Sequence, residues 1–90
     1  MDIEQKLQEF QQKYSDLEQQ AEPGSLKRSE YSNVIACLNR GQHESPAKQR
    51  AFVMQISLHE MTKSGSPSQR QIMREALKEL EWIADLRPLR

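Results

Sequence analysis

The placement of glycine and proline constrains the fold of this 90-residue chain more than any other feature. All three glycines and all four prolines lie between segments of helical periodicity, and none lies inside one. Because these residues break or cap helices, they divide the chain into four predicted helices. The helices are expected over about residues 2–21, 25–40, 46–63 and 67–86. No run alternates in valine, isoleucine and threonine as a strand would. The sequence therefore predicts an all-α fold, a small four-helix bundle with short loops.

The first helix carries a heptad seam of the kind found in coiled coils. Its apolar residues follow one another at spacings of 4, 3, 4, 3 and 4, and the positions between them are polar. Three destinations for this narrow seam stay open: a parallel twin in a homodimer, a groove in its own bundle, or a groove in another protein. In the parallel twin, Lys13 would face Glu18. The candidate partner-binding residues on this helix are Ile3, Leu7, Phe10, Tyr14 and Leu17.

The domain organisation follows from the same pattern. Residues 1–22 are expected to form an N-terminal amphipathic helix that is extended or swapped in one alternative, and residues 25–90 a three-helix core. Together they are expected to make one domain, because 90 residues are too few for two.

The third segment is apolar on two sides, which predicts a central helix sandwiched between neighbours. One face holds Ala47, Ala51, Met54, Leu58 and Met61, and the other holds Phe52, Val53 and Ile56. The third and fourth segments both begin with serine followed by proline, so Ser45 and Ser66 are expected to cap them.

The fourth segment leaves a tryptophan outside its apolar face. That face is complete without Trp82, which projects among charged neighbours, with Leu86 one turn further along. Tryptophan is enriched among the few residues that dominate binding energy, so Trp82 and Leu86 are candidate partner-binding residues. In the alternative, the first helix or the C-terminal tail covers Trp82.

The sequence contains no complete motif of a catalytic site. His59-Glu60 resembles the start of a zinc-protease motif, but Lys63 stands where the second histidine is needed. Cys37 and His43 are fewer ligands than a zinc site uses. There is neither a nucleophilic serine motif nor a glycine-rich phosphate loop. We expect no enzyme, no cofactor and no metal.

The charge balance and the cysteine content limit which kinds of partner and which cellular compartment we expect. Thirteen basic and thirteen acidic residues cancel, which argues against a protein that coats nucleic acid by bulk charge. The single cysteine, Cys37, forms no internal disulfide, and a reducing compartment is expected. No apolar run approaches about 18 residues, and the acidic start lacks the features of a signal peptide. We expect a cytoplasmic protein without a membrane partner.

Two functions follow from these observations. The first is a non-enzymatic helical module, such as a regulator, adaptor or secretion-type chaperone, that binds a protein partner or itself as a homodimer. The alternative is a helix-turn-helix regulator of nucleic acid, with its turn at residues 63–66 and with Arg70, Arg74 and Lys78 facing phosphates. Acidic residues interleave with these three, which favours an ordinary exposed helix face.

Overall fold

The computed structural model describes residues 2–89 and contains four α-helices. They are α1 (Ile3–Gln20), α2 (Leu26–Asn39), α3 (Ala47–Met61) and α4 (Pro67–Ala84). No strand is present within the described residues. The predicted all-α class and the four-helix bundle are confirmed, and each observed boundary lies within two residues of the expected one.

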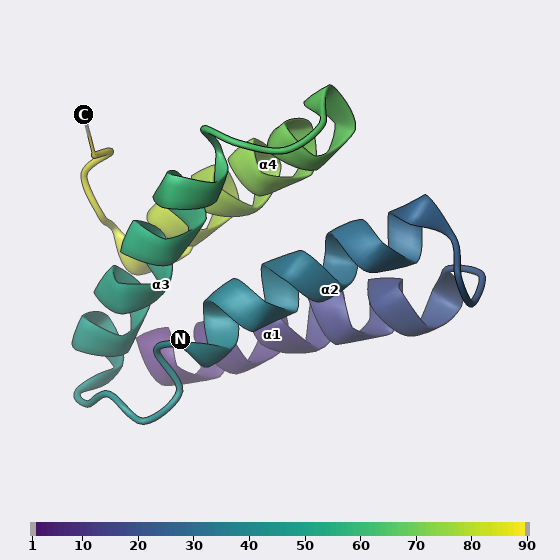
Figure 1. The fold of residues 1–90 in the computed structure, drawn as a ribbon. Helices are drawn as coiled ribbons and strands as arrows, with labels where there is room; N and C mark the ends of the chain where they lie inside the picture. The colour runs from purple at the N-terminus through teal and green to yellow at the C-terminus, as the bar shows by residue number, and fades with distance from the viewer. Residues whose placement is uncertain (1, 90) are drawn as a thin grey trace.

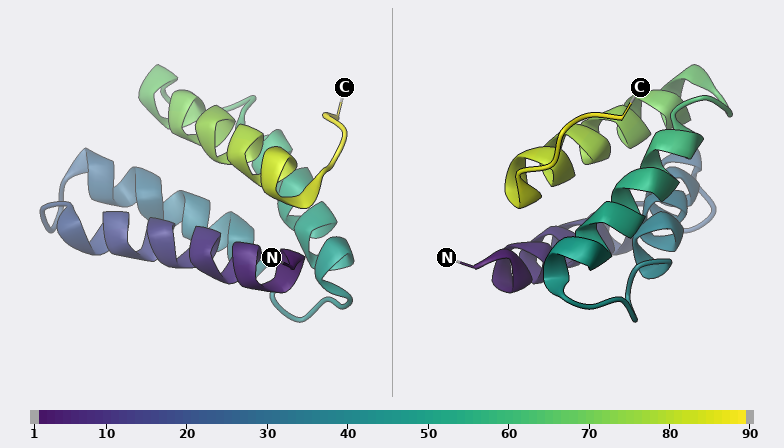
Figure 2. Two further views of the ribbon diagram at one scale, coloured as in Figure 1. Left: turned by 180° about the vertical axis from the view of Figure 1, so that it is seen from behind. Right: turned by 90° about the vertical axis from the view of Figure 1, so that its left-hand side faces the viewer.

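Two helical hairpins make up the bundle (Figures 1 and 2). The helices α1 and α2 lie side by side in one hairpin, and α3 and α4 form the other. The beginning of α3 crosses the beginning of α1, where Arg50 and Glu4 form an ion pair of 2.5 Å. All six pairs of helices are in contact, so every helix borders the core.

The core draws buried apolar side chains from all four helices. On α1, the rings of Phe10 and Tyr14 pack edge to face at 5.3 Å between centroids. Leu7 is also buried, while Ile3 and Leu17 are partly buried against the same cluster. The heptad seam therefore packs into its own bundle. Burial of large apolar side chains, each stabilising by about 1.5–3 kcal/mol, explains why the seam is occupied within the chain.

Side-chain caps begin three of the four helices. Asp2, Ser25 and Ser66 each accept a hydrogen bond from the backbone amide three residues ahead. The expected cap at Ser45 is wrong. The helix begins one residue later than expected, so Pro46 occupies the cap position and makes no side-chain hydrogen bond there.

The loop before α3 is held by close packing instead. A Cβ atom added to Gly41 would lie 2.7 Å from the carbonyl oxygen of Arg50, so only glycine allows this approach. The guanidinium of Arg50 also donates to the carbonyl of Glu44 at 3.2 Å.

The expectation of a sandwiched α3 is also wrong. Its first face is buried, with Ala51, Met54 and Leu58 in the core, but Phe52 and Ile56 on the other face are 39% and 42% exposed. Periodicity reports which positions are apolar, and it does not report whether a neighbouring helix is present to cover them.

Candidate protein-binding groove

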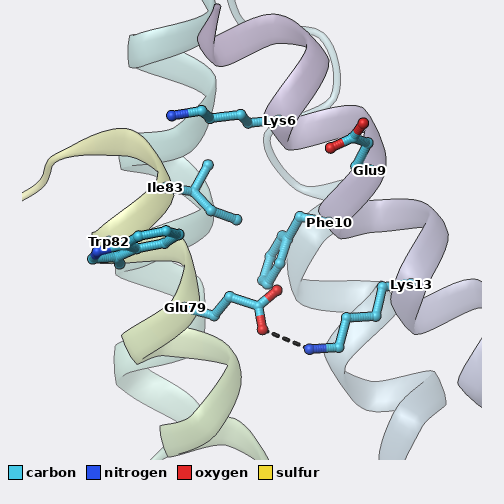
Figure 3. A pocket seen from close by; sticks show the side chains of 7 residues that line it. All are labelled: Lys6, Glu9, Phe10, Lys13, Glu79, Trp82 and Ile83. Carbon is cyan, nitrogen blue, oxygen red and sulfur yellow. Dashed lines mark hydrogen bonds and ion pairs between the residues drawn. The ribbon is translucent and has the colours of Figure 1, made fainter. Parts of the chain in front are cut away.

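A groove with a volume of about 590 Å³ runs between α1 and α4 (Figure 3). Phe10 from α1 and Ile83 from α4 form its apolar floor, and charged side chains from both helices stand around it. Its lining residues are Lys6, Glu9, Phe10, Lys13, Glu79, Trp82 and Ile83.

Trp82 stands on the α4 rim of this groove and is 82% exposed, the largest value among the exposed large hydrophobic residues of the described chain. The buried face of α4 is complete without it, as the periodicity predicted. Neither α1 nor the tail covers the indole. The tail instead runs along α3, where the Gln55 amide donates to the carbonyl of Arg87 at 2.7 Å.

Leu86 does not extend the surface around Trp82. The prediction placed it one helical turn beyond Trp82, but α4 ends at Ala84 and Asp85 adopts a left-handed conformation with φ of 53°. This change of direction turns Leu86 back against the core, where it is partly buried. The two candidate anchors are therefore separated, and only Trp82 stays on the surface.

One ion pair crosses the groove. Lys13 Nζ lies 2.6 Å from Glu79 Oε1, and both side chains remain partly exposed, so the pair contributes little to stability. It links the α1 and α4 walls of the groove. In the parallel-twin alternative Lys13 would face Glu18 of the second copy, but Glu18 accepts a hydrogen bond from the Ser32 hydroxyl within its own chain.

The glutamates of α4 also affect the pKa of Tyr14, a residue of the α1 seam. Burial, together with the negative charges of Glu79 and Glu75, raises the pKa of Tyr14 to about 12. The phenol therefore stays neutral and its apolar packing is kept well into the alkaline range.

A second, shallower hollow of about 460 Å³ lies further along α1. Leu17, partly buried in the seam, is its apolar element, and polar residues surround it. The lining residues are Glu9, Gln12, Lys13, Asp16, Leu17 and Gln20. The two hollows share Glu9 and Lys13, so both open along the same edge of α1.

The residues of the nucleic-acid alternative lie along the outside of α4. Arg70 donates to the carbonyl of Gly65 at 2.7 Å, and Arg74 donates to the Gln71 side chain at 3.1 Å, while Lys78 is exposed. The preceding helix, α3, lies antiparallel alongside α4 in a hairpin. In a helix-turn-helix the two helices instead cross at about 90–120°, so this arrangement does not resemble that motif.

The hairpin is closed at its far end by Lys48, near the start of α3. Its ammonium group donates to the carbonyl of Ala84, at the end of α4, at 2.7 Å. A lysine at this position satisfies carbonyls that have no partner within the helix.

The residues that were weighed for catalysis or metal binding lie apart. Cys37 is buried, with its Sγ 3.9 Å from the carbonyl oxygen of Ser57. His59 is partly buried, and its Nε2 has no hydrogen-bond partner. Within residues 2–89, no three histidine, cysteine or acidic side chains are grouped as a metal site requires. None of the four described helices has the length and apolar character needed to cross a bilayer.

Comparison with protein families, curated proteins and solved structures finds no match for this chain. Sequence reasoning identified Phe10 and Trp82 but missed Lys6, Glu9, Glu79 and Ile83 as their neighbours. Their meeting depends on how α1 packs on α4, and no signal in the sequence reports that packing.

Proposed function

We propose that this chain is a non-enzymatic interaction module that binds a protein partner through the α1–α4 groove and Trp82. The observation that carries this proposal is the 82% exposure of Trp82 beside an apolar-floored groove. Tryptophan presents about 150–250 Å² of mostly apolar surface, and its removal from water on binding lowers the free energy. It is also one of the residue types most enriched where alanine substitution abolishes binding.

The surroundings of Trp82 have the anatomy of a protein interface. The floor, Phe10 and Ile83, is apolar, and the rim carries Lys6, Glu9 and the Lys13–Glu79 ion pair. An apolar centre with a polar rim is the usual arrangement at protein–protein contacts, where the rim gives specificity and the centre gives affinity. A partner side chain entering the groove would cover the part of Ile83 that is still exposed, and Trp82 would pack on the partner.

The exposed face of α3 is the weaker candidate for a binding surface. Phe52 and Ile56 expose about half the fraction that Trp82 does, and neither lines either of the hollows on α1. Scattered half-exposed apolar residues are ordinary on small proteins.

The proposed role is that of a small regulator, adaptor or secretion-type chaperone, which acts by occupying a partner's surface. A reducing compartment such as the cytoplasm is the proposed site of action, because the only cysteine is a buried free thiol.

The test is affinity capture from an extract of the source cells after nuclease treatment. We compare the unaltered chain with Trp82→Ala and with the control Leu26→Ala, which removes a side chain that is 67% exposed on α2 and lies outside the groove. The unaltered chain and the control should retain the same protein, and Trp82→Ala should lose it. Equal retention by all three chains contradicts the proposal, as does retention of nothing by a chain that is also monomeric in solution.

The same extract without nuclease tests the nucleic-acid alternative. Retention of nucleic acid that falls steeply with salt and falls further in Arg74→Ala and Lys78→Ala would favour that alternative instead. Capture that is unaffected by nuclease and tolerant of salt supports a protein partner.

A further inference from the structure

The exposed edge of α1 carries a regular stripe of polar and charged residues next to the groove. Its members follow at spacings of 4, 3, 4, 3 and 4, so they lie on one face of the helix. All of them are exposed except Lys6, which is half-buried. The stripe consists of Asp2, Lys6, Glu9, Lys13, Asp16 and Gln20.

The order of charges in this stripe is complementary to its own reverse. Read forward, the four central residues Lys6, Glu9, Lys13 and Asp16 alternate as plus, minus, plus, minus. An antiparallel second copy places Lys6 opposite Asp16 and Glu9 opposite Lys13, and two-fold symmetry makes each contact twice. A parallel second copy would instead place every charge opposite an identical charge.

The positions of the two hollows along α1 fit the same antiparallel arrangement. The groove with Trp82 on its rim lies beside Lys6 and Glu9, and the hollow around Leu17 lies beside Lys13 and Asp16. Reversing one α1 against another therefore brings the Trp82 end of one copy to the Leu17 end of the other. An exposed apolar ring and a hollow with an apolar element then face each other at both ends of the contact.

From this pattern we infer that a second copy of this chain is the partner, docked antiparallel along the α1 edge with each Trp82 seated in the Leu17 hollow of the other copy. The inference rests on the proposed function and specifies its partner. The intrachain pair leaves Lys13 able to take part, because an ammonium group has three donors and Glu79 accepts from one of them.

The expected dimer is weak and forms reversibly with concentration. A protein–protein interface of standard size buries about 800 Å² of solvent-accessible surface on each partner. That area is about a seventh of the 5718 Å² surface of this chain. Exposed ion pairs add little affinity and mainly set the orientation, so Trp82 supplies most of the binding.

Sedimentation velocity measures this association directly, over protein concentrations from about 1 μM to about 1 mM. The unaltered chain should pass from monomer to dimer, and Trp82 fluorescence should shift to the blue over the same range. Trp82→Ala should weaken the dimer about 30-fold or more, as loss of a dominant anchor does, while Leu26→Ala leaves it unchanged.

Charge reversal tests the antiparallel orientation. Lys6→Asp alone, or Asp16→Lys alone, turns two attractive contacts into repulsive ones and should weaken the dimer about tenfold or more. The double variant with both substitutions exchanges the two charges and should restore it. Lys63→Asp, at an exposed lysine in the α3–α4 loop, is the matched control and should have no effect.

Each variant is checked for helix content, so that unfolding is not mistaken for dissociation. The double variant places its acid near the start of α1 and its base nearer the end, which the helix dipole favours. A chain that stays monomeric at every concentration overturns the inference, as does a dimer that Lys6→Asp leaves unaffected. If Trp82-dependent capture of a different protein succeeds while the chain is monomeric, the inference fails and the proposed function stands.

Discussion

Replacing Trp82 with alanine is expected to leave the free energy of unfolding nearly unchanged, although tryptophan to alanine is among the most destabilising changes in a protein core. In the core such a substitution costs about 3–5 kcal/mol. Trp82 lies outside the core, with 82% of its surface in water.

The expected magnitude follows from that exposure. About a fifth of a side chain with about 150–250 Å² of surface is hidden, and at about 25 cal/mol per Å² this corresponds to about 0.8–1.2 kcal/mol. Alanine has the higher helix propensity by up to about 0.7 kcal/mol, which offsets most of the loss within α4. The net change should therefore be within about 1 kcal/mol of zero.

Phe10→Ala is the matched comparison, because Phe10 lies across the same groove and is 2% exposed. It should destabilise the fold by about 3–5 kcal/mol, a large share of the roughly 5–13 kcal/mol expected for a chain of this length. Denaturant unfolding followed by circular dichroism measures both variants, since Trp82 is the only tryptophan and its fluorescence disappears with it.

The measurement is made at about 1 μM, so that self-association does not add to apparent stability. A loss of about 3 kcal/mol or more in Trp82→Ala would contradict this expectation. It would mean that Trp82 is covered in the folded monomer and that the proposed binding surface is wrong.

Three other substitutions test the interior and the helix ends. The pKa of Tyr14 is about 10 in the unfolded chain, and burial and the nearby glutamates raise it to about 12 in the folded chain. The unfolded state therefore loses a proton that the native state keeps, and the free energy of unfolding should fall by roughly 3 kcal/mol as pH rises through this window. Urea titrations at several pH values should show this loss in the unaltered chain and lack it in Tyr14→Phe. Lys48→Ala removes the donor to the carbonyls of Ala84 and Asp85 and should lower the melting temperature, at a cost of about 1 kcal/mol; an unchanged melting temperature contradicts that role. Glu30→Met should stabilise the fold by about 1 kcal/mol or more in denaturant, because Glu30 is 2% exposed and its Oε2 has no hydrogen-bond partner; a loss of stability would show that the carboxylate is satisfied.

The helix boundaries were predictable because their signals are local. Asp2, Ser25 and Ser66 cap the helices that follow them, and glycine and proline separate the segments. The buried face of α4 and the exposure of Trp82 outside it also follow from periodicity within one helix. The two local errors, at Ser45 and Leu86, lie where a helix began one residue later or ended two residues earlier than expected.

The four amphipathic helices were predictable from the amino-acid sequence, because capping, helix breaking and 3.6-residue periodicity act over a few neighbouring residues. Three features came from the packing of the helices: the α1 seam enters its own bundle, Phe52 and Ile56 lack a covering helix, and Lys6, Glu79 and Ile83 meet Trp82 around one groove. These outcomes depend on which apolar faces pack together. The hydrophobic effect has no direction and is proportional to the apolar area removed from water. An apolar stripe of a given width is therefore stabilised to a similar extent by any apolar surface that covers it.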